Sequence, residues 1–322
     1  MLGLWLDQGR ATLRHDLPEP EAAPGEVRVQ ILRAGVCATD LALRRGYMGF
    51  RGVPGHEFVG IALDGALRGQ RVVGEINAGC RRCPTCLAGL DGHAPDPRHC
   101  PHRTVLGILG RPGAFAERIA LPEANLFPVP DAVSTDAAVF TEPLAAALAI
   151  ADQVALRPGL RALVAGDGRL GLLCAHALAR SGVEVAVAGR HPERCGLLPA
   201  GARHVTGLLE DAASPAAFDL AVEATGNPAA LAAVCARVRP RGTVVLKTTT
   251  EQPVALDLAT VVVNELTLVG SRCGRFAPAL DVLARGLVPV ESMIATRYPL
   301  AELPQALDRA ARGGLLKVLV ES

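Results

Sequence analysis

The chain has 322 residues, of which half are hydrophobic and only 3% are aromatic, so aliphatic side chains must build its cores. This length predicts about two domains, at roughly 100–200 residues each. The 33 basic residues almost balance the 32 acidic ones, and no basic run is interleaved with aromatic residues, which argues against a nucleic-acid partner. There is neither a signal-peptide pattern nor a run of roughly 18 apolar residues, so we expect a cytoplasmic protein with no membrane partner.

The first third of the chain is predicted to be β-strands and loops. Residues 25–37 alternate apolar with polar side chains, which indicates a strand that ends near Cys37. Short apolar runs bounded by Gly and Pro predict further strands at 56–63, 70–76 and 113–122.

The middle of the chain changes to an α/β pattern. Ser134 to Leu156 is rich in Ala and Leu and predicts one helix, which Ser134 or Thr135 can cap. After Gly159, apolar strands alternate with helical segments as far as Ser271. This alternation predicts βαβ units and a doubly wound parallel sheet. Two more helices and a closing strand, near residues 316–321, complete the chain.

A glycine-rich turn lies between the first strand and the first helix of this α/β region. It has the form G-x-G-x-x-G, in which Gly166 makes the tight turn, Gly168 lets backbone approach a pyrophosphate, and Gly171 permits close helix–strand packing. An ordinary strand–helix turn is the alternative, but the surrounding pattern favours dinucleotide binding. The candidate binding residues are Gly166, Gly168, Leu170 and Gly171.

The end of the following strand bears on the choice of cofactor. NAD sites usually place an acid there, about 20 residues on, to bind the ribose 2′-hydroxyl. This chain has Gly189, followed by Arg190 and later by Arg194. An Arg can grip a 2′-phosphate that a carboxylate would repel, so we favour NADP(H) over NAD(H). The alternative is that both arginines are solvated surface residues.

Four of the nine cysteines are packed between residues 80 and 100. In a reducing compartment this spacing favours a metal over disulfides. Four thiolates make a closed tetrahedral zinc site with no position for substrate, which is a structural site. The candidate ligands are Cys80, Cys83, Cys86 and Cys100, with His93 and His99 as alternatives to the last.

A second group of possible zinc ligands is spread along the chain. Cys37 ends a strand with Thr39 two residues on, His56 and Glu57 follow a Pro-Gly turn, and Glu142 precedes a proline. Three protein ligands and one open position are the pattern of a catalytic zinc. Each residue alone could equally be a buried thiol, a core histidine or a helix cap, and spacing does not join them.

Taken together, the motifs resemble those of the zinc-dependent medium-chain dehydrogenases/reductases, the alcohol dehydrogenase superfamily. The resemblance is nearest to the sorbitol, threonine and glucose dehydrogenase branch, in a short and poorly characterised subgroup. It spans nearly the whole chain and rests on GVCATDLALRRGY, VPGHEFVG, CRRCPTC, VLGILGRPGAFAERIALP, TEPLAAAL, GDGRLGLL, VEATGNPAAL and VVNELTLVGSR, in that order.

The resemblance implies a GroES-like β-rich catalytic domain at 1–148 and 272–322, with a Rossmann domain at 149–271 inserted between its parts. It implies a zinc-dependent oxidoreductase that transfers a hydride between NADP(H) or NAD(H) and an alcohol, polyol or sugar, or the matching carbonyl. The family forms homodimers and homotetramers, commonly by pairing Rossmann-sheet edges, and residues 264–271 are a candidate edge.

The resemblance also assigns roles to single residues. The resemblance implies two zinc ions, one catalytic and one structural. Cys37 and His56 match the first two ligands of the catalytic zinc. Glu57 and Glu142 both match carboxylates found at the catalytic zinc, and the choice between them is open. Thr39 matches the Ser or Thr that hydrogen-bonds the substrate oxygen.

Lys317 falls near a basic residue that contacts the cofactor phosphates, and a surface charge is the alternative. The sequence departs from the family at Ala42, where many members have a histidine that ends a proton relay, and in the long gap before Cys100. Loss of that histidine leaves a second hypothesis: a non-catalytic NADP(H)- and zinc-binding redox sensor or partner-binding protein.

Overall fold

The computed structural model describes residues 1–88, 97–207, 209, 216–250 and 254–322. Two compact units are present: unit 1 is Met1–Glu142 with Ala279–Ser322, and unit 2 is Pro143–Pro278. Mixed sheets in unit 1 and a parallel sheet with helices in unit 2 confirm the α/β fold class. The functional boundaries predicted at 148 and 272 stay a prediction.

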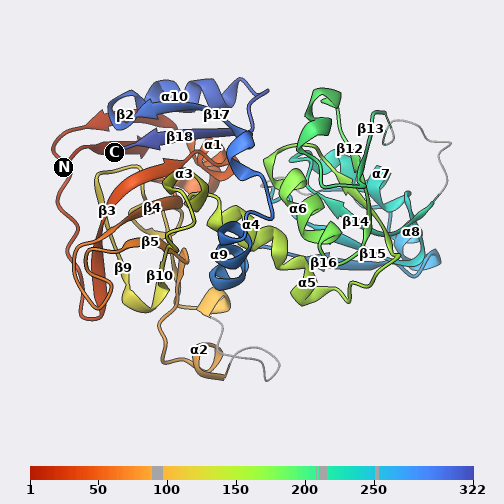
Figure 1. Cartoon of the computed structure of the whole chain (residues 1–322), viewed down its shortest axis with the longest axis horizontal. Helices are drawn as coiled ribbons and strands as arrows, with labels where there is room; N and C mark the ends of the chain where they lie inside the picture. The colour runs from red at the N-terminus through yellow and green to blue at the C-terminus, as the bar shows by residue number, and fades with distance from the viewer. Residues whose placement is uncertain (89–96, 208, 210–215, 251–253) are drawn as a thin grey trace. The chain divides into compact units, whose positions relative to one another are not determined.

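Unit 1 is built on a seven-stranded sheet (Figure 1). Its strand order is β10-β5-β4-β3-β18-β17, and β9 also pairs with β3. Because β18 pairs antiparallel with β3, the last segment of the chain completes a sheet that the first third begins. The strands are β3 (Glu26–Gly35), β4 (Glu57–Ala62), β5 (Arg71–Gly74), β9 (Arg118–Pro122), β10 (Leu126–Pro128), β17 (Ile294–Pro299) and β18 (Lys317–Glu321).

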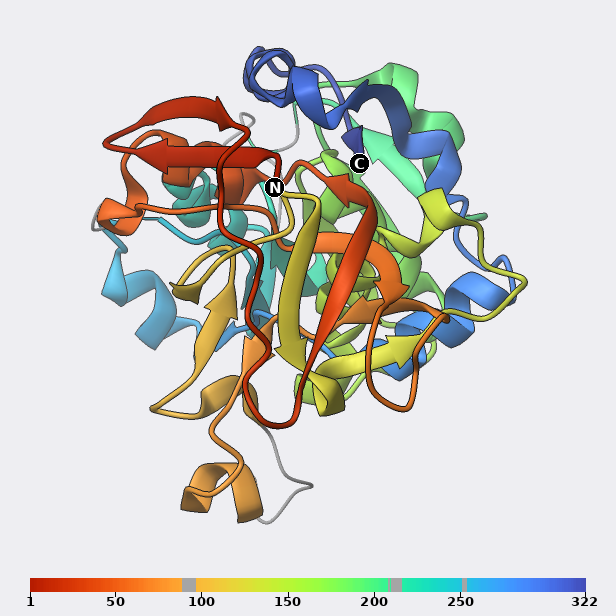
Figure 2. The same ribbon diagram turned by 90° about the vertical axis from the view of Figure 1, so that its left-hand side faces the viewer.

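Two smaller sheets complete unit 1. One is the hairpin of β1 (Gly3–Asp7) and β2 (Arg10–Arg14), and the other joins β6 (Asn77–Ala78), β7 (Thr104–Leu106) and β8 (Gly110–Arg111). Helix α2 (Pro84–Ala88) lies on a lobe that extends away from the main sheet in both views (Figures 1 and 2). Helices α1 (Ala38–Arg44), α3 (Thr135–Ala138) and α10 (Leu303–Ala311) also belong to this unit.

Unit 2 contains a six-stranded parallel sheet in the order β13-β12-β11-β14-β15-β16. The order reverses direction at β11, which gives the doubly wound arrangement that the sequence predicts. The strands are β11 (Arg161–Ala165), β12 (Glu184–Ala188), β13 (Arg203–Val205), β14 (Phe218–Glu223), β15 (Val238–Leu246) and β16 (Thr267–Gly270), with helices α6 (Arg169–Ala179), α7 (Leu231–Cys235) and α8 (Leu258–Val263).

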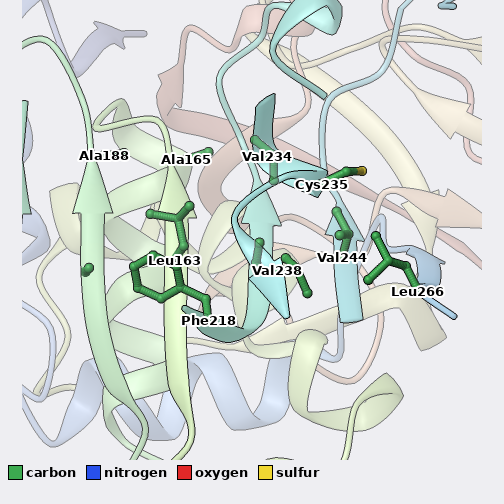
Figure 3. Packing of buried hydrophobic residues seen from close by; sticks show 11 residues of the cluster. Leu163, Ala165, Ala188, Phe218, Val234, Cys235, Val238, Val244 and Leu266 are labelled. Atoms are coloured by element: carbon green, nitrogen blue, oxygen red, sulfur yellow. The ribbon is translucent and has the colours of Figure 1, made fainter. Parts of the chain in front are cut away.

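The core of unit 2 consists of aliphatic side chains from its strands. Residues 162–165 of β11 are fully buried, as expected for a parallel strand covered on both faces. Figure 3 shows Leu163 beside Phe218, with Val238 and Val244 from β15 nearby. The side chain of Cys235 is buried in this cluster and acts as a small hydrophobic residue.

The helix predicted from Ser134 to Leu156 is instead three short ones: α3, α4 (Thr141–Leu148) and α5 (Ile150–Gln153). Ser134 caps the first, as predicted, because its Oγ accepts the N–H of Ala137 at 3.1 Å. Pro143 has no N–H and its ring excludes the carbonyl four residues earlier, so a helix begun at Ser134 cannot continue past it, whereas the first turn of α4 can hold a proline. In the described ranges, no helix is long and apolar enough to cross a membrane.

Replacing Gly171 by Ala should destabilise unit 2 by about 1–3 kcal/mol, because its Cβ would lie 1.9 Å from the carbonyl oxygen of Gly166, a backbone atom that cannot yield cheaply. Gly196→Ala is the matched control, since its Cβ meets nothing within 4 Å. Urea unfolding followed by circular dichroism measures both variants. Equal stability of the two variants would contradict the close packing of this turn.

Candidate active site

Cys37 lies at the junction between β3 and α1, where its backbone is held by a buried carboxylate. Its N–H donates to Asp40 Oδ2 at 2.8 Å. The other oxygen of Asp40 accepts the N–H of Gly55 at 3.2 Å and lies 3.3 Å from His56 Nδ1. One carboxylate therefore connects the segment that carries Cys37 to the segment that carries His56.

Sequence reasoning missed Asp40, although a signal was present. Asp40 follows Cys37 by three residues in the first turn of α1, where a carboxylate is favoured. Carboxylates commonly orient metal-binding histidines through the ring nitrogen that the metal does not use. The part that sequence could not show is that the β3–β4 pairing, with Gly35 opposite Glu57, brings His56 to this position.

Three of the predicted ligands come together at the end of this strand pair. One ligand atom each from Cys37, His56 and Glu57 lies within 4.8 Å of the other two. Thiolate, imidazole and carboxylate are all zinc ligands, and the set leaves room for a fourth partner. The side chains of His56 and Glu57 are buried and Cys37 is half-buried, so two of the three groups are desolvated as well as close.

The electrostatics of His56 fit a cation at this position. Burial alone lowers the pKa of His56, but the charges of Asp40 and Cys37 outweigh it and raise the pKa well above its usual value. His56 Nδ1 is buried and lies 3.3 Å from Asp40 Oδ1, without the geometry of a hydrogen bond. The charges of Asp40 and Cys37 thus favour a positive charge at the imidazole, and a metal ion at this set would supply it in place of a proton.

Glu57 is paired with Lys317, which is fully buried. Lys317 Nζ also lies 5.1 Å above the ring of Phe140, which favours the charged ammonium. A Cβ at Gly35 would lie 2.8 Å from both Glu57 Oε2 and Lys317 Nζ, so a side chain here would displace the ion pair. The structure places Lys317 beside Glu57 in unit 1, and the contact with cofactor phosphates stays a prediction.

Glu142 and Thr39 lie near this set without joining it. The carboxyl of Glu142, in the first turn of α4, has its pKa raised to about 7, first by burial and then by the charges of Glu57 and Glu75. Thr39 Oγ1 is 3.9 Å from Cys37 Sγ. The structure therefore brings Glu57 into contact range of Cys37 and His56 and leaves Glu142 as a neighbouring carboxyl.

The four clustered cysteines also come together, on the lobe that carries α2. One sulfur each from Cys80, Cys83, Cys86 and Cys100 lies within 4.8 Å of the others, and all four are free thiols. Cys83 Sγ and Cys100 Sγ are 3.7 Å apart. His99 is exposed and outside this set, and His93 lies outside the described residues.

Backbone N–H groups favour thiolates in this cluster. The pKa of Cys80 falls to about 6, chiefly because the N–H of Arg82 bonds its sulfur. Cys100 Sγ accepts the N–H groups of Cys80 at 3.4 Å and His102 at 3.3 Å. Burial raises the pKa of Cys86 to about 12, so its proton must be displaced by a metal. Four sulfurs in one small volume fit a closed zinc site.

The glycine-rich turn of unit 2 has the local structure that the sequence predicts. Gly166 has φ +110°, a conformation that favours glycine, and Gly168 precedes the first residue of α6. A Cβ at Gly168 would meet nothing within 4 Å, whereas one at Gly171 would clash with backbone. The loop is thus tight on the helix side and open beside Gly168, a cradle that fits a dinucleotide phosphate at a helix N-terminus.

The two arginines after β12 lie in different environments. Arg190 is exposed. Arg194 is buried, and its Nη1 donates to the carbonyl oxygen of Asp167, inside the glycine-rich turn, at 2.9 Å. Arg194 therefore holds the loop, while Arg190 is free to move toward a bound molecule. The roles of both arginines and of Leu170 toward a cofactor stay predictions.

Known proteins resemble the chain over nearly all of its length. Two family models match it, "Alcohol dehydrogenase GroES-like domain" over residues 23–131 and "Zinc-binding dehydrogenase" over residues 170–285. The L-threonine 3-dehydrogenase of Streptomyces avermitilis is 30% identical, over 99% of this chain and 96% of the relative. The sorbitol dehydrogenase of Bacillus subtilis is 27% identical, over 94% of this chain and 92% of the relative.

Solved structures agree with these matches. A structure from Sinorhizobium meliloti 1021, described as a zinc-binding dehydrogenase bound to NADP, has a TM-score of 0.87 at 26% identity, covering 100% of this chain and 99% of that one. An alcohol dehydrogenase of Thermus sp. ATN1 has a TM-score of 0.87 at 27% identity, with the same coverage. These matches favour a working enzyme over the non-catalytic alternative. The chain therefore belongs to the zinc-binding dehydrogenases of the alcohol dehydrogenase family, oxidoreductases that act on CH–OH groups with a nicotinamide cofactor.

Proposed function

We propose that Cys37, His56 and Glu57 hold the catalytic zinc of an NADP(H)-preferring alcohol dehydrogenase, with Glu142 as the alternative third ligand. The observation that carries this proposal is the close set of one half-buried thiol, one buried imidazole and one buried carboxylate. Cys80, Cys83, Cys86 and Cys100 would hold a second, structural zinc. The proposed catalytic domain is 1–148 with 272–322, and the proposed dinucleotide domain is 149–271.

The bound groups supply Lewis acidity, from zinc, and a hydride acceptor, from the nicotinamide. The residues of the chain position these groups and handle the proton. Thr39 Oγ1, beside Cys37, would accept the proton of the substrate hydroxyl and pass it on, since Ala42 cannot. Asp40 orients the ring of His56. Lys317 balances the charge of Glu57, so this carboxylate can stay ionised beside the other negative groups of the site.

The proposed substrates are small alcohols, polyols or sugars, or the matching carbonyls. NADP(H) is favoured because Arg190 is exposed directly after β12 and can bond a 2′-phosphate. The cytoplasm remains the proposed location, because a site of four thiolates requires a reducing compartment.

Zinc analysis of purified protein should find about two zinc ions per chain, one for each set of ligands. Cys37→Ser should lose one zinc and nearly all alcohol oxidation, because the catalytic set loses its thiolate. Cys174→Ser, a change at a buried thiol outside both sets, should keep both ions. A wild-type chain with one zinc or none would contradict the proposed pair of sites.

Replacing Arg190 by Ala should raise the Kd of NADPH about tenfold and leave that of NADH unchanged, because only the 2′-phosphate needs the guanidinium. Gly168→Ala should weaken both cofactors, since its Cβ would fill the cradle. Nicotinamide fluorescence titration measures all four constants. If Arg190→Ala affects NADH and NADPH alike, the preference for NADP(H) has another origin.

The exposed edge of unit 2 is the proposed homodimer or homotetramer interface. Strand β16 is the last strand of its sheet, so one side of its backbone has no neighbouring strand within the described chain. Helix α8 exposes Leu258, Val262 and Val263 at 66%, 73% and 78%. Apolar side chains with such high exposed fractions, near the unpaired edge of a sheet, favour contact with a second copy of the chain.

A charge at the centre of this surface should break the assembly. Val262→Glu should shift the mass measured by light scattering after size exclusion toward the monomer, because a buried unpaired carboxylate is costly. Leu109→Glu, at an apolar position of unit 1 that is 41% exposed, serves as the control. An unchanged mass in Val262→Glu would show that the subunits meet elsewhere or not at all.

A further inference from the structure

The end of β12 lacks an acidic residue, but it does not lack a carboxylate. A Cβ at Gly189 would lie 2.1 Å from both Cγ and Oδ2 of Asp167. Asp167 is the second residue of the glycine-rich turn, and it reaches across from β11 to the neighbouring strand end. Its carboxylate therefore occupies the space into which a side chain at position 189 would begin to extend.

Asp167 is held at this position from several sides. Its Oδ2 accepts the N–H of His191 at 2.6 Å and lies 3.1 Å from His204 Nε2. Arg194 Nη1 lies 3.7 Å from Oδ1 and donates to the carbonyl oxygen of the same residue. The side chain is 8% exposed, so the carboxylate is fixed and largely desolvated.

The neighbours keep this carboxylate charged. Burial alone would raise the pKa of Asp167, but the bonds from His204 and the His191 N–H, with the charges of His191 and Arg194, lower it below its ordinary value. A fixed, ionised carboxylate accepts hydrogen bonds well and repels a nearby phosphate. The strand-end acid of NAD sites acts on the ribose 2′-position in the same way.

We propose that Asp167 is the specificity-determining residue at the adenosine ribose, where it takes the place of the missing strand-end acid. It accepts a hydrogen bond from the 2′-hydroxyl of NAD(H) and opposes the 2′-phosphate of NADP(H). The difference in affinity that Arg190 creates in favour of NADP(H) is therefore small, and the chain uses both cofactors. This inference rests on the dinucleotide loop assigned under the proposed function.

Gly189 supports this assignment independently of the charges. A side chain at position 189 would collide with Asp167 where it now lies. The present position of the Asp167 carboxylate therefore goes together with glycine at position 189. Gly189 is not among the glycines with positive φ, and an L-residue fits its backbone once Asp167 is removed. The carboxylate can thus be moved back to the strand end by exchanging the two residues.

The test uses adenosine-half ligands, which need no turnover. Calorimetry measures the Kd of ADP-ribose and of 2′-phospho-ADP-ribose on the purified chain. Asp167→Asn keeps the shape and can still accept the His191 N–H. It should weaken ADP-ribose roughly three- to tenfold and strengthen 2′-phospho-ADP-ribose at least about threefold, because a charged acceptor becomes neutral.

Asp219→Asn is the matched control. Asp219 also accepts a backbone N–H, from Arg161 at 2.8 Å, and pairs with Arg239, but it lies at the opposite, amino-terminal end of the sheet. This variant should leave both constants unchanged. The double variant Asp167→Gly, Gly189→Asp should recover ADP-ribose affinity relative to Asp167→Gly alone, because the carboxylate returns from the other strand.

The outcomes separate this inference from the proposed function. Equal changes in both ligands, or none, with Asp167→Asn would overturn the specificity role and leave the dinucleotide site standing. A wild-type chain that binds neither ligand would overturn the proposed dinucleotide site together with the role of Asp167. Opposite changes in the two ligands, with rescue by the double variant, support the role.

Discussion

The Asp40 carboxylate is the interaction on which the candidate active site depends. It accepts N–H groups from Cys37 and Gly55 and faces His56, so it joins two segments that carry ligands. A buried carboxylate is tolerated only when such partners satisfy it. Without it, two N–H groups would lose their acceptor and His56 would lose the carboxylate it faces, so the candidate ligands would not be held in place before a metal binds.

The second constraint is charge balance, which the last segment of the chain supplies when it returns to unit 1. Glu57 and Glu142 are acidic groups close to one another, and burial already raises the pKa of the second to about 7. Lys317, the first residue of β18, provides the buried counter-ion to Glu57. Because β18 pairs with β3, the last strand delivers this charge to the first sheet, at a point where Gly35 leaves the space.

The sequence predicts what depends on local patterns. Glycine spacing predicts the tight turn between β11 and α6, and cysteine spacing predicts the cluster on the α2 lobe, because neighbours along the chain make both. The family resemblance joined Cys37, His56 and Glu57 across the chain, but two other contacts between distant segments were missed. Asp40 acts on His56 only through the β3–β4 register, and Asp167 reaches position 189 only because β11 and β12 are neighbours. The carboxylate that the sequence lacks at position 189, after β12, is that of Asp167, which follows β11.

The central claim is that Cys37, His56 and Glu57 form a metal site separate from the four-cysteine cluster. Crystals of the zinc-loaded protein, measured on both sides of the zinc absorption edge, test it most directly. The account predicts two anomalous peaks, one within bonding distance of Cys37 and His56 with a carboxylate, and one among the four cysteines. A single peak among the cysteines, with no metal between Cys37 and His56, would contradict it.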